Sequence, residues 1–99
     1  MYPAGNFYVH KIKACVPGSN LQGFSGKTVE ECKEVCDKHA DCLAFEFGVA
    51  HGGSSPTNKP GDCRPKSSAD ACGCDGAHFN TDLYIKKQAN GDELFVLRS

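Results

Sequence analysis

The segment from Thr28 to Phe47 constrains the fold more than any other, because it joins a capped helix to an aromatic strand through closely spaced cysteines. Thr28 and Glu31 have the spacing of a capping box, in which each side chain binds the backbone N–H of the other residue. A helix is therefore predicted to begin after Thr28. Cys32 and Cys36 project side by side from successive turns of this helix, so each needs a bonding partner elsewhere.

The predicted helix is amphipathic, with an apolar face and a charged face that follow its three- and four-residue periodicity. The apolar face carries Val29, Cys32, Val35, Cys36 and His39, and the charged face carries Glu30, Lys33, Glu34 and Asp37. We expect the first face to be buried. Surface helices normally have one charged face, so we expect the second to be solvated rather than to dock a partner.

Several segments have the composition of β-strands. In the segment from Cys42 to Val49, Leu43, Phe45 and Phe47 alternate with Ala44 and Glu46, which predicts a half-buried strand in the centre of the sheet. Further strands are predicted at Asn6–Cys15, near Cys63, at Leu83–Lys87 and at Leu94–Leu97, with a short turn or strand fragment around Phe24. Asn90-Gly91 is typical of a tight turn, so the last two strands are predicted to form a hairpin.

Two long stretches lack apolar periodicity and are rich in turn residues. The first runs from His51 to Asp62 and the second from Ser67 to Asn80. We expect both to be irregular and exposed, with Asp75-Gly76 forming a turn. Surface loops that a rigid scaffold holds are where recognition residues concentrate, so a ligand site is predicted here. An alternative is that both stretches are spacers without a partner.

Seven cysteines in 99 residues are several times the normal usage. This content favours disulfide bonds formed in an oxidising compartment, so we expect a secreted or extracellular protein whose signal peptide was removed. The alternative is a cytosolic zinc protein. However, the only close pair is Cys72-Gly73-Cys74, and the sequence has no paired Cys-x-x-Cys motifs. We therefore expect no bound metal.

Charge and hydropathy exclude several classes of partner. Eleven Lys and Arg residues nearly balance twelve Asp and Glu residues, and no long run of one sign occurs. Nucleic-acid binding requires a basic surface, so we expect no nucleic-acid partner. No apolar run approaches the length that spans a bilayer, so no membrane span is expected either.

The sequence contains no motif that indicates an enzyme. Candidate reactive groups are Cys72, Cys74, His39, His51 and His78, but none lies within a known nucleophile motif. The Asp residues lack the regular spacing of a calcium-binding loop. We expect no catalytic activity and no cofactor.

The helix and the strand after it resemble the PAN/apple domain family. The resemblance is carried by the Thr-x-Glu-x-Cys-x-x-x-Cys helix, here Thr28, Glu30, Cys32 and Cys36, and by the Cys-x-Ala-Phe-Glu-Phe strand that starts at Cys42. It extends from about Phe7 to about Lys86. It implies an α+β fold in which an antiparallel sheet of about five strands, a usual number for a sheet, curls around one α-helix.

The resemblance implies a single domain over residues 1–99, with a core at about 7–87 and a C-terminal extension or hairpin strand at 88–99. It also implies three disulfide bonds. These join Cys36 to Cys42, Cys32 to Cys63, and Cys15 to either Cys72 or Cys74.

The seventh cysteine leaves one thiol without a partner in this scheme. Cys74 lies nearer the strand at Leu83, whose neighbour should be the first strand, so we expect Cys74 to pair with Cys15. Cys72 is then a free thiol or a link between two molecules. A homodimer could form through Cys72 or through the C-terminal strand.

The resemblance implies a secreted, non-catalytic module for protein–carbohydrate or protein–protein adhesion. An alternative is a small secreted effector or inhibitor that blocks a receptor or a protease. The expected partner is an extracellular protein or a glycan. Seven polar side chains of the irregular stretches and their borders could hydrogen-bond it. They are His51, Asn58, Lys59, Arg64, Asp75, His78 and Asn80.

Overall fold

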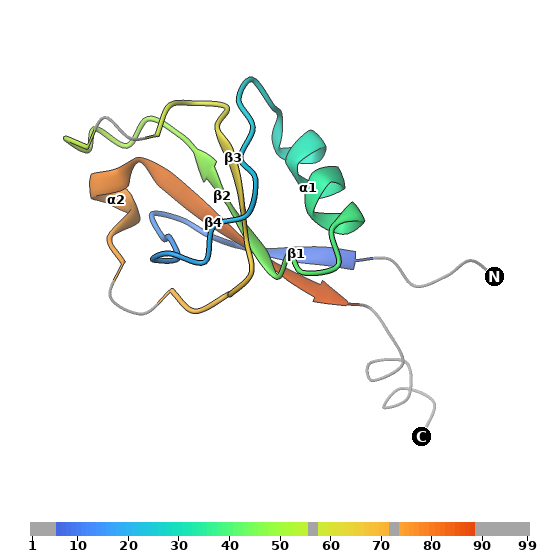
Figure 1. The fold of residues 1–99 in the computed structure, drawn as a ribbon. Helices are drawn as coiled ribbons and strands as arrows, with labels where there is room; N and C mark the ends of the chain where they lie inside the picture. Colours follow the sequence, from blue (N-terminus) through green and yellow to red (C-terminus); the bar gives the residue numbers. More distant parts are fainter. Residues whose placement is uncertain (1–5, 56–57, 72–73, 89–99) are drawn as a thin grey trace.

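The computed structural model describes residues 6–55, 58–71 and 74–88 of the chain. Figure 1 shows its elements, which in chain order are β1 (Asn6–Lys11), α1 (Val29–Lys38), β2 (Ala44–Gly48), β3 (Cys63–Lys66), α2 (Gly76–Phe79) and β4 (Thr81–Gln88). The four strands form one antiparallel sheet in the order β1-β4-β2-β3. The fold is therefore a small, disulfide-linked α+β domain.

Helix α1 begins where the sequence predicts. Thr28 Oγ1 accepts a hydrogen bond from Glu31 N (3.1 Å), and Glu31 Oε1 accepts one from Thr28 N (2.9 Å). Cys32 and Cys36 are fully buried against β2 and β3. His39, predicted on the buried face, is instead exposed, because it follows the last helical residue and its backbone is extended.

The two faces of the sheet are packed differently. Strand alternation and cross-strand pairing place Phe45, Phe47 and Tyr84 on the face that α1 covers, which we call the helix face. Ala44 and Leu83 lie on the other side, which we call the opposite face, where Val16, Ala69 and Ala71 pack on them. All five residues of β2 are buried. The prediction that one side of this strand is exposed is wrong, because the chain around Val16 covers that side.

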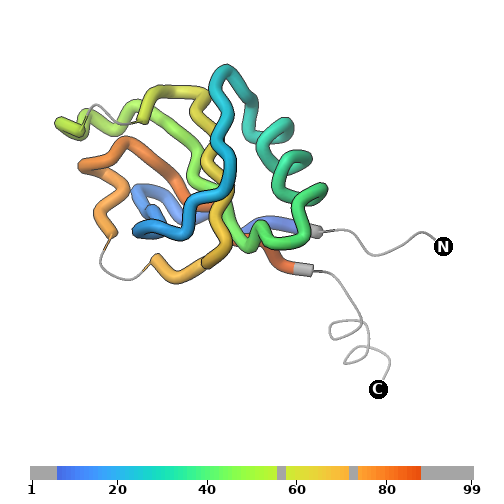
Figure 2. The backbone as a smooth tube through the Cα atoms, in the orientation of Figure 1, coloured from blue at the N-terminus to red at the C-terminus, as the bar shows by residue number. Residues whose placement is uncertain are grey.

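The sheet has four strands in the described residues, rather than the predicted five or so. The segment around Phe24 forms only two isolated bridges to β3, Asn20 to Lys66 and Phe24 to Cys63. Figure 2 shows this segment running beside β3. The first strand was predicted to reach Cys15 but ends at Lys11, because Lys13 takes a left-handed conformation (φ 58°) that turns the chain.

Strand β4 extends the predicted Leu83–Lys87 segment at both ends. It lies between β1 and β2, so both of its edges already pair with a strand along most of its length. The predicted Asn90-Gly91 turn and the Leu94–Leu97 strand lie outside the described residues. Neither helix of the described part is long and apolar enough to cross a membrane.

The stretch predicted to be irregular, Ser67–Asn80, contains the short helix α2. Asp75 Oδ1 caps this helix by accepting hydrogen bonds from Ala77 N and His78 N, so the predicted turn at Asp75 is a helix start. Helix α2 ends before Asn80, whose backbone is left-handed (φ 60°). A Cβ at Gly76 would lie 2.3 Å from the backbone of Lys13, so only glycine allows this close approach.

Candidate ligand-binding site

Three disulfide bonds hold the framework of the site. Cys32 bonds Cys63 and Cys36 bonds Cys42, with Cα–Cα distances of 5.7 and 5.3 Å. Cys15 bonds Cys74 at 5.5 Å. These are the pairs that the family resemblance and the strand proximity predict. Cys72 lies outside the described residues, so the prediction of a free or intermolecular thiol stays a prediction.

The helix face is filled by aromatic side chains. The Phe45 and Tyr84 rings stack with centroids 4.9 Å apart, and Tyr8 meets Phe45 edge-on at 5.3 Å. The Tyr8 hydroxyl lies 2.6 Å from Asp37 Oδ1 in α1, and burial together with this carboxylate raises the pKa of Tyr8 well above its ordinary value. Packing of this kind stabilises the fold and leaves little space between these rings for a ligand.

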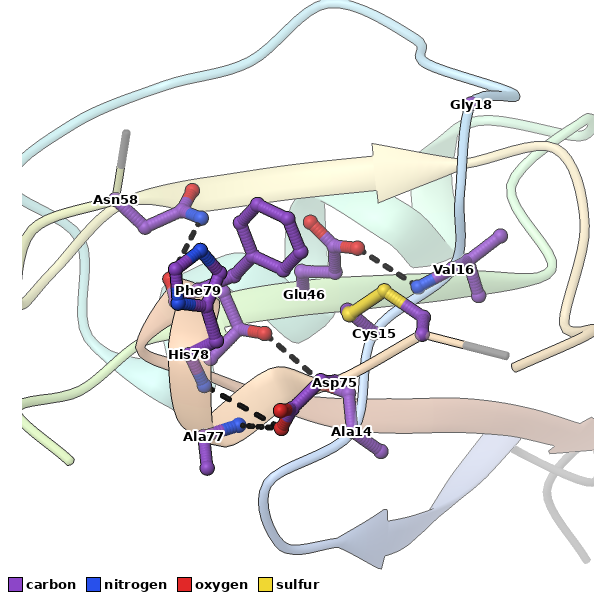
Figure 3. Close-up of a disulfide and its surroundings, with 12 residues drawn as sticks. Ala14, Cys15, Val16, Gly18, Glu46, Asn58, Asp75, Ala77, His78 and Phe79 are labelled. Atoms are coloured by element: carbon purple, nitrogen blue, oxygen red, sulfur yellow. Dashed lines mark hydrogen bonds between the residues drawn. A yellow bond between two sulfur atoms is a disulfide. The ribbon is translucent and has the colours of Figure 1, made fainter. Parts of the chain in front are cut away.

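A cavity of about 250 Å³ lies on the opposite face, next to the Cys15–Cys74 disulfide. Figure 3 shows the Phe79 ring, the Glu46 carboxylate and the Cys15 sulfur gathered around this space. Residues from five parts of the chain line it: Cys15, Val16, Pro17, Asn20, Glu46, Asn58, Arg64, Lys66, Cys74 and Phe79. Pro17 and Asn20 are exposed, so the rim of the cavity meets solvent. Buried polar groups and an apolar wall thus share one open space.

A buried ion pair forms part of the cavity floor. Lys66 Nζ lies 3.6 Å from Glu46 Oε2, and the two side chains are only 5% and 7% exposed. Lys66 also donates hydrogen bonds to Gly18 O (3.0 Å) and to Asn20 Oδ1, and Glu46 Oε2 accepts one from Val16 N (2.8 Å). Burial lowers the pKa of Lys66, and the negative charge of Glu46 partly offsets this effect. The positive charge of Lys66 and the negative charge of Glu46 therefore compensate each other.

Asn58 supplies a buried polar group with unused hydrogen-bonding capacity. Its Nδ2 donates to Phe79 O at 2.9 Å, as the dashed line in Figure 3 shows. Its Oδ1 is buried and has no hydrogen-bond partner among the described residues. A buried carbonyl oxygen without a partner carries a desolvation cost that a bound donor can remove.

Phe79 forms the aromatic wall of the cavity. It ends the short helix α2, and it remains 37% exposed. The hydrogen bond from Asn58 and the cap of α2 by Asp75 fix its backbone. A partly exposed ring that is held in place can stack against an apolar face of a ligand.

The structure brings together only some of the predicted ligand residues. Asn58 and Arg64 line the cavity. Lys59 lies on a second depression, which it shares with Arg64 and Phe24. His78 is exposed, and its Nδ1 is 3.3 Å from Ser54 Oγ.

The other three predicted residues hold the backbone in place. Asp75 caps α2. Asn80 Oδ1 accepts hydrogen bonds from the backbone N–H groups of His51 (3.0 Å) and Gly53 (2.9 Å). The His51 side chain contacts the Asp82 carboxylate.

Asp82 is a buried residue on the helix face, and its carboxylate binds three other groups. The sequence did not predict these contacts. Its two carboxylate oxygens contact His10 Nε2 (2.8 Å) and His51 Nε2 (2.6 Å), and Oδ1 also accepts a hydrogen bond from Lys13 N (2.9 Å). Burial alone would raise the pKa of Asp82, but these contacts outweigh it and hold the pKa below its ordinary value. No group of ligands in the described residues has the arrangement of a metal site.

Sequence reasoning missed Glu46, Lys66 and Phe79 as site residues. Glu46 alternates with aromatic residues in β2, which only indicates a side chain on the opposite face. That this face is covered, and that Lys66 reaches across it, depends on the register between β2 and β3. Phe79 belonged to a stretch expected to be irregular. Only the cap and the helical turn at α2 place its ring beside the cavity.

Comparisons of the chain with protein-family models, with curated proteins and with solved structures find no match. Its function must therefore be inferred from its own residues.

Proposed function

We propose that the chain is a secreted, non-catalytic binding module of the PAN/apple type, and that it binds carbohydrate in the cavity beside the Cys15–Cys74 disulfide. Three disulfides support the extracellular part of this proposal, because such bonds persist in oxidising compartments. The PAN/apple part is supported by the way α1 is held. The Cys32–Cys63 disulfide joins α1 to β3, and the Cys36–Cys42 disulfide joins it to the segment before β2.

The observation that carries the carbohydrate proposal is the pairing of Asn58 with Phe79. Asn58 Oδ1 is a buried acceptor without a partner, and the Phe79 ring beside it is partly exposed. A sugar offers both complements, since its hydroxyls donate hydrogen bonds and its ring has an apolar face of C–H groups. A purely apolar ligand would leave the Asn58 oxygen without a partner.

The size of the cavity favours one sugar ring. Pockets for drug-sized ligands occupy roughly 300–1,000 Å³. The cavity here, at about 250 Å³, is smaller and open at Pro17 and Asn20. A single ring at the end of a glycan chain can enter it while the rest of the chain leaves through the rim.

A glycan array probed with the purified protein tests this proposal. We expect binding to at least one glycan, and we expect Phe79→Ala to weaken it about tenfold because the stacking surface is lost. Phe7→Ala is the matched control, since Phe7 is similarly exposed (48% against 37%) but does not line the cavity. Failure to bind any glycan, together with retention of a partner from extracellular extract, would support protein adhesion or the inhibitor function instead.

A further inference from the structure

We propose that the cavity beside the Cys15–Cys74 disulfide selects a neutral sugar that donates hydrogen bonds from two adjacent hydroxyls, one to Asn58 Oδ1 and one to Glu46 Oε1. This inference rests on the proposed carbohydrate-binding function and names the class of ligand. It follows from which hydrogen-bonding groups in the cavity are already in use.

Two donor groups of the cavity floor, the Lys66 ammonium and the Val16 N–H, are already used. Lys66 Nζ donates to Gly18 O and to Asn20 Oδ1, and it faces Glu46 Oε2 in the buried ion pair. An ammonium group has three donor positions, so these three contacts account for them. The N–H of Val16 is also used, because it donates to Glu46 Oε2. A ligand that only accepts hydrogen bonds therefore gains little from Lys66 and Val16.

The acceptors remain available. Asn58 Oδ1 is buried without a hydrogen-bond partner in the described part of the chain. The hydrogen bond from Val16 N and the 3.6 Å contact with Lys66 Nζ both use Glu46 Oε2, and Oε1 makes no hydrogen bond with any described residue. A carboxylate can accept hydrogen bonds at both oxygens. The cavity thus presents two acceptors, and a matching ligand must bring two donors.

The charges of the cavity are also balanced. Glu46 pairs with Lys66, and Arg64 Nη2 lies 3.8 Å from Asp62 Oδ2. A charged ligand would lose its hydration on entering and would find no uncompensated partner in return. A neutral donor loses less hydration, and its hydrogen bonds to the two acceptors compensate for that loss. Hydroxyl groups on neighbouring ring carbons supply two neutral donors together, and the Phe79 ring can cover the C–H face between them.

Fluorinated sugars test the donor requirement, because fluorine replaces a hydroxyl with little change of size and cannot donate a hydrogen bond. The probes are the methyl glycosides of glucose, galactose and mannose, followed by the monofluorinated forms of the one that binds most tightly. Affinities are measured by NMR titration of the native protein. We expect fluorine at two adjacent positions to weaken binding at least about tenfold each, since one partner is a carboxylate and the other is buried.

Asn58→Leu assigns one of these hydroxyls to its acceptor. This variant has a similar side-chain size but lacks the carbonyl oxygen, so the effect of fluorine should disappear at one of the two positions and persist at the other. Gln22→Leu is the control, because Gln22 is exposed and does not line the cavity. For each fluorinated sugar, Gln22→Leu should leave the ratio of its affinity to that of the parent sugar unchanged. If Asn58→Leu does not fold, the fluorine series on the native protein decides by itself.

The results separate this inference from the proposed function. A hexose that perturbs the cavity residues but tolerates fluorine at every position would overturn the inference and leave carbohydrate binding intact. So would fluorine effects that Asn58→Leu leaves unchanged at both positions. If no hexose of the panel binds at millimolar concentration and the glycan array is also blank, the proposed function fails and the inference fails with it.

Discussion

The helix face and the opposite face of the sheet differ in what packs on them. The helix face carries two of the three disulfides, stacked aromatic rings and the buried contacts of α1. The opposite face has one disulfide and aliphatic residues, and its polar groups surround an open cavity. A small domain has little apolar surface to bury, so concentrating the packing on one face leaves the other less completely filled.

The largest expected effect comes from removing one disulfide on each face. Loops of 31 and 59 residues give about 4 kcal/mol of stabilisation each in the loop-entropy model. Cys32→Ala with Cys63→Ala also leaves a void in the aromatic core, where both residues are fully buried. We expect this variant to lose its cooperative urea transition.

Cys15→Ala with Cys74→Ala is the matched variant, since its loop-entropy cost is similar. It should keep the circular dichroism of α1 and lose ligand binding, because the bond it removes holds the wall of the cavity. Complete unfolding of this variant, with a folded Cys32→Ala/Cys63→Ala protein, would reverse the roles of the two faces.

Asp82 should give an intermediate effect that depends on pH. Its folded-state pKa lies below the ordinary value of 3.8, so its stabilisation is complete above that value and is lost as the pH falls through the folded-state pKa. We expect Asp82→Asn to cost about 2 kcal/mol at neutral pH, because three hydrogen bonds to a carboxylate are weakened.

Urea unfolding at a series of pH values measures the Asp82 effect. The difference between native and Asp82→Asn should shrink as the solution becomes strongly acidic. Asp41→Asn provides the control, since Asp41 is exposed. A difference that stays constant at every pH would mean that the charge of Asp82 does not stabilise the fold.

The smallest expected effect concerns Tyr8, which joins β1 to α1 on the helix face. Its hydroxyl lies near Lys33 O (3.2 Å) and Asp37 Oδ1 (2.6 Å). Tyr8→Phe should cost about 1 kcal/mol in urea unfolding, because one hydrogen bond is lost while the ring remains.

Tyr84→Phe is the matched control for Tyr8, since the Tyr84 hydroxyl has no hydrogen bond to any described residue and its ring stacks on Phe45. It should change stability less than Tyr8→Phe does. Equal effects of the two substitutions would show that the link between β1 and α1 contributes nothing.

The sequence predicts the helix face much better than the opposite face. The capping box, the helical spacing of Cys32 and Cys36, and the aromatic strand are local patterns, and each appears in the structure. The cavity depends on contacts between distant segments, such as Lys66 with Gly18 and Asn58 with Phe79. Local periodicity does not carry this information.

The number of strands in the described residues also differs from the prediction, for a physical reason. Composition indicates which segments can adopt an extended conformation. Backbone pairing with a neighbouring strand decides which of these segments become strands. The segment around Phe24 makes only isolated bridges to β3. Lys13 turns the first strand towards Asp82 before it can reach Cys15.

An amide NMR titration with the glycan that binds most tightly on the array tests the central claim most directly, which is that the opposite face recognises the ligand. The account predicts chemical-shift changes centred on the cavity, at Val16, Glu46, Asn58 and Phe79. Changes confined to the charged face of α1, around Glu30, Lys33 and Glu34, with the cavity residues unaffected, would contradict it.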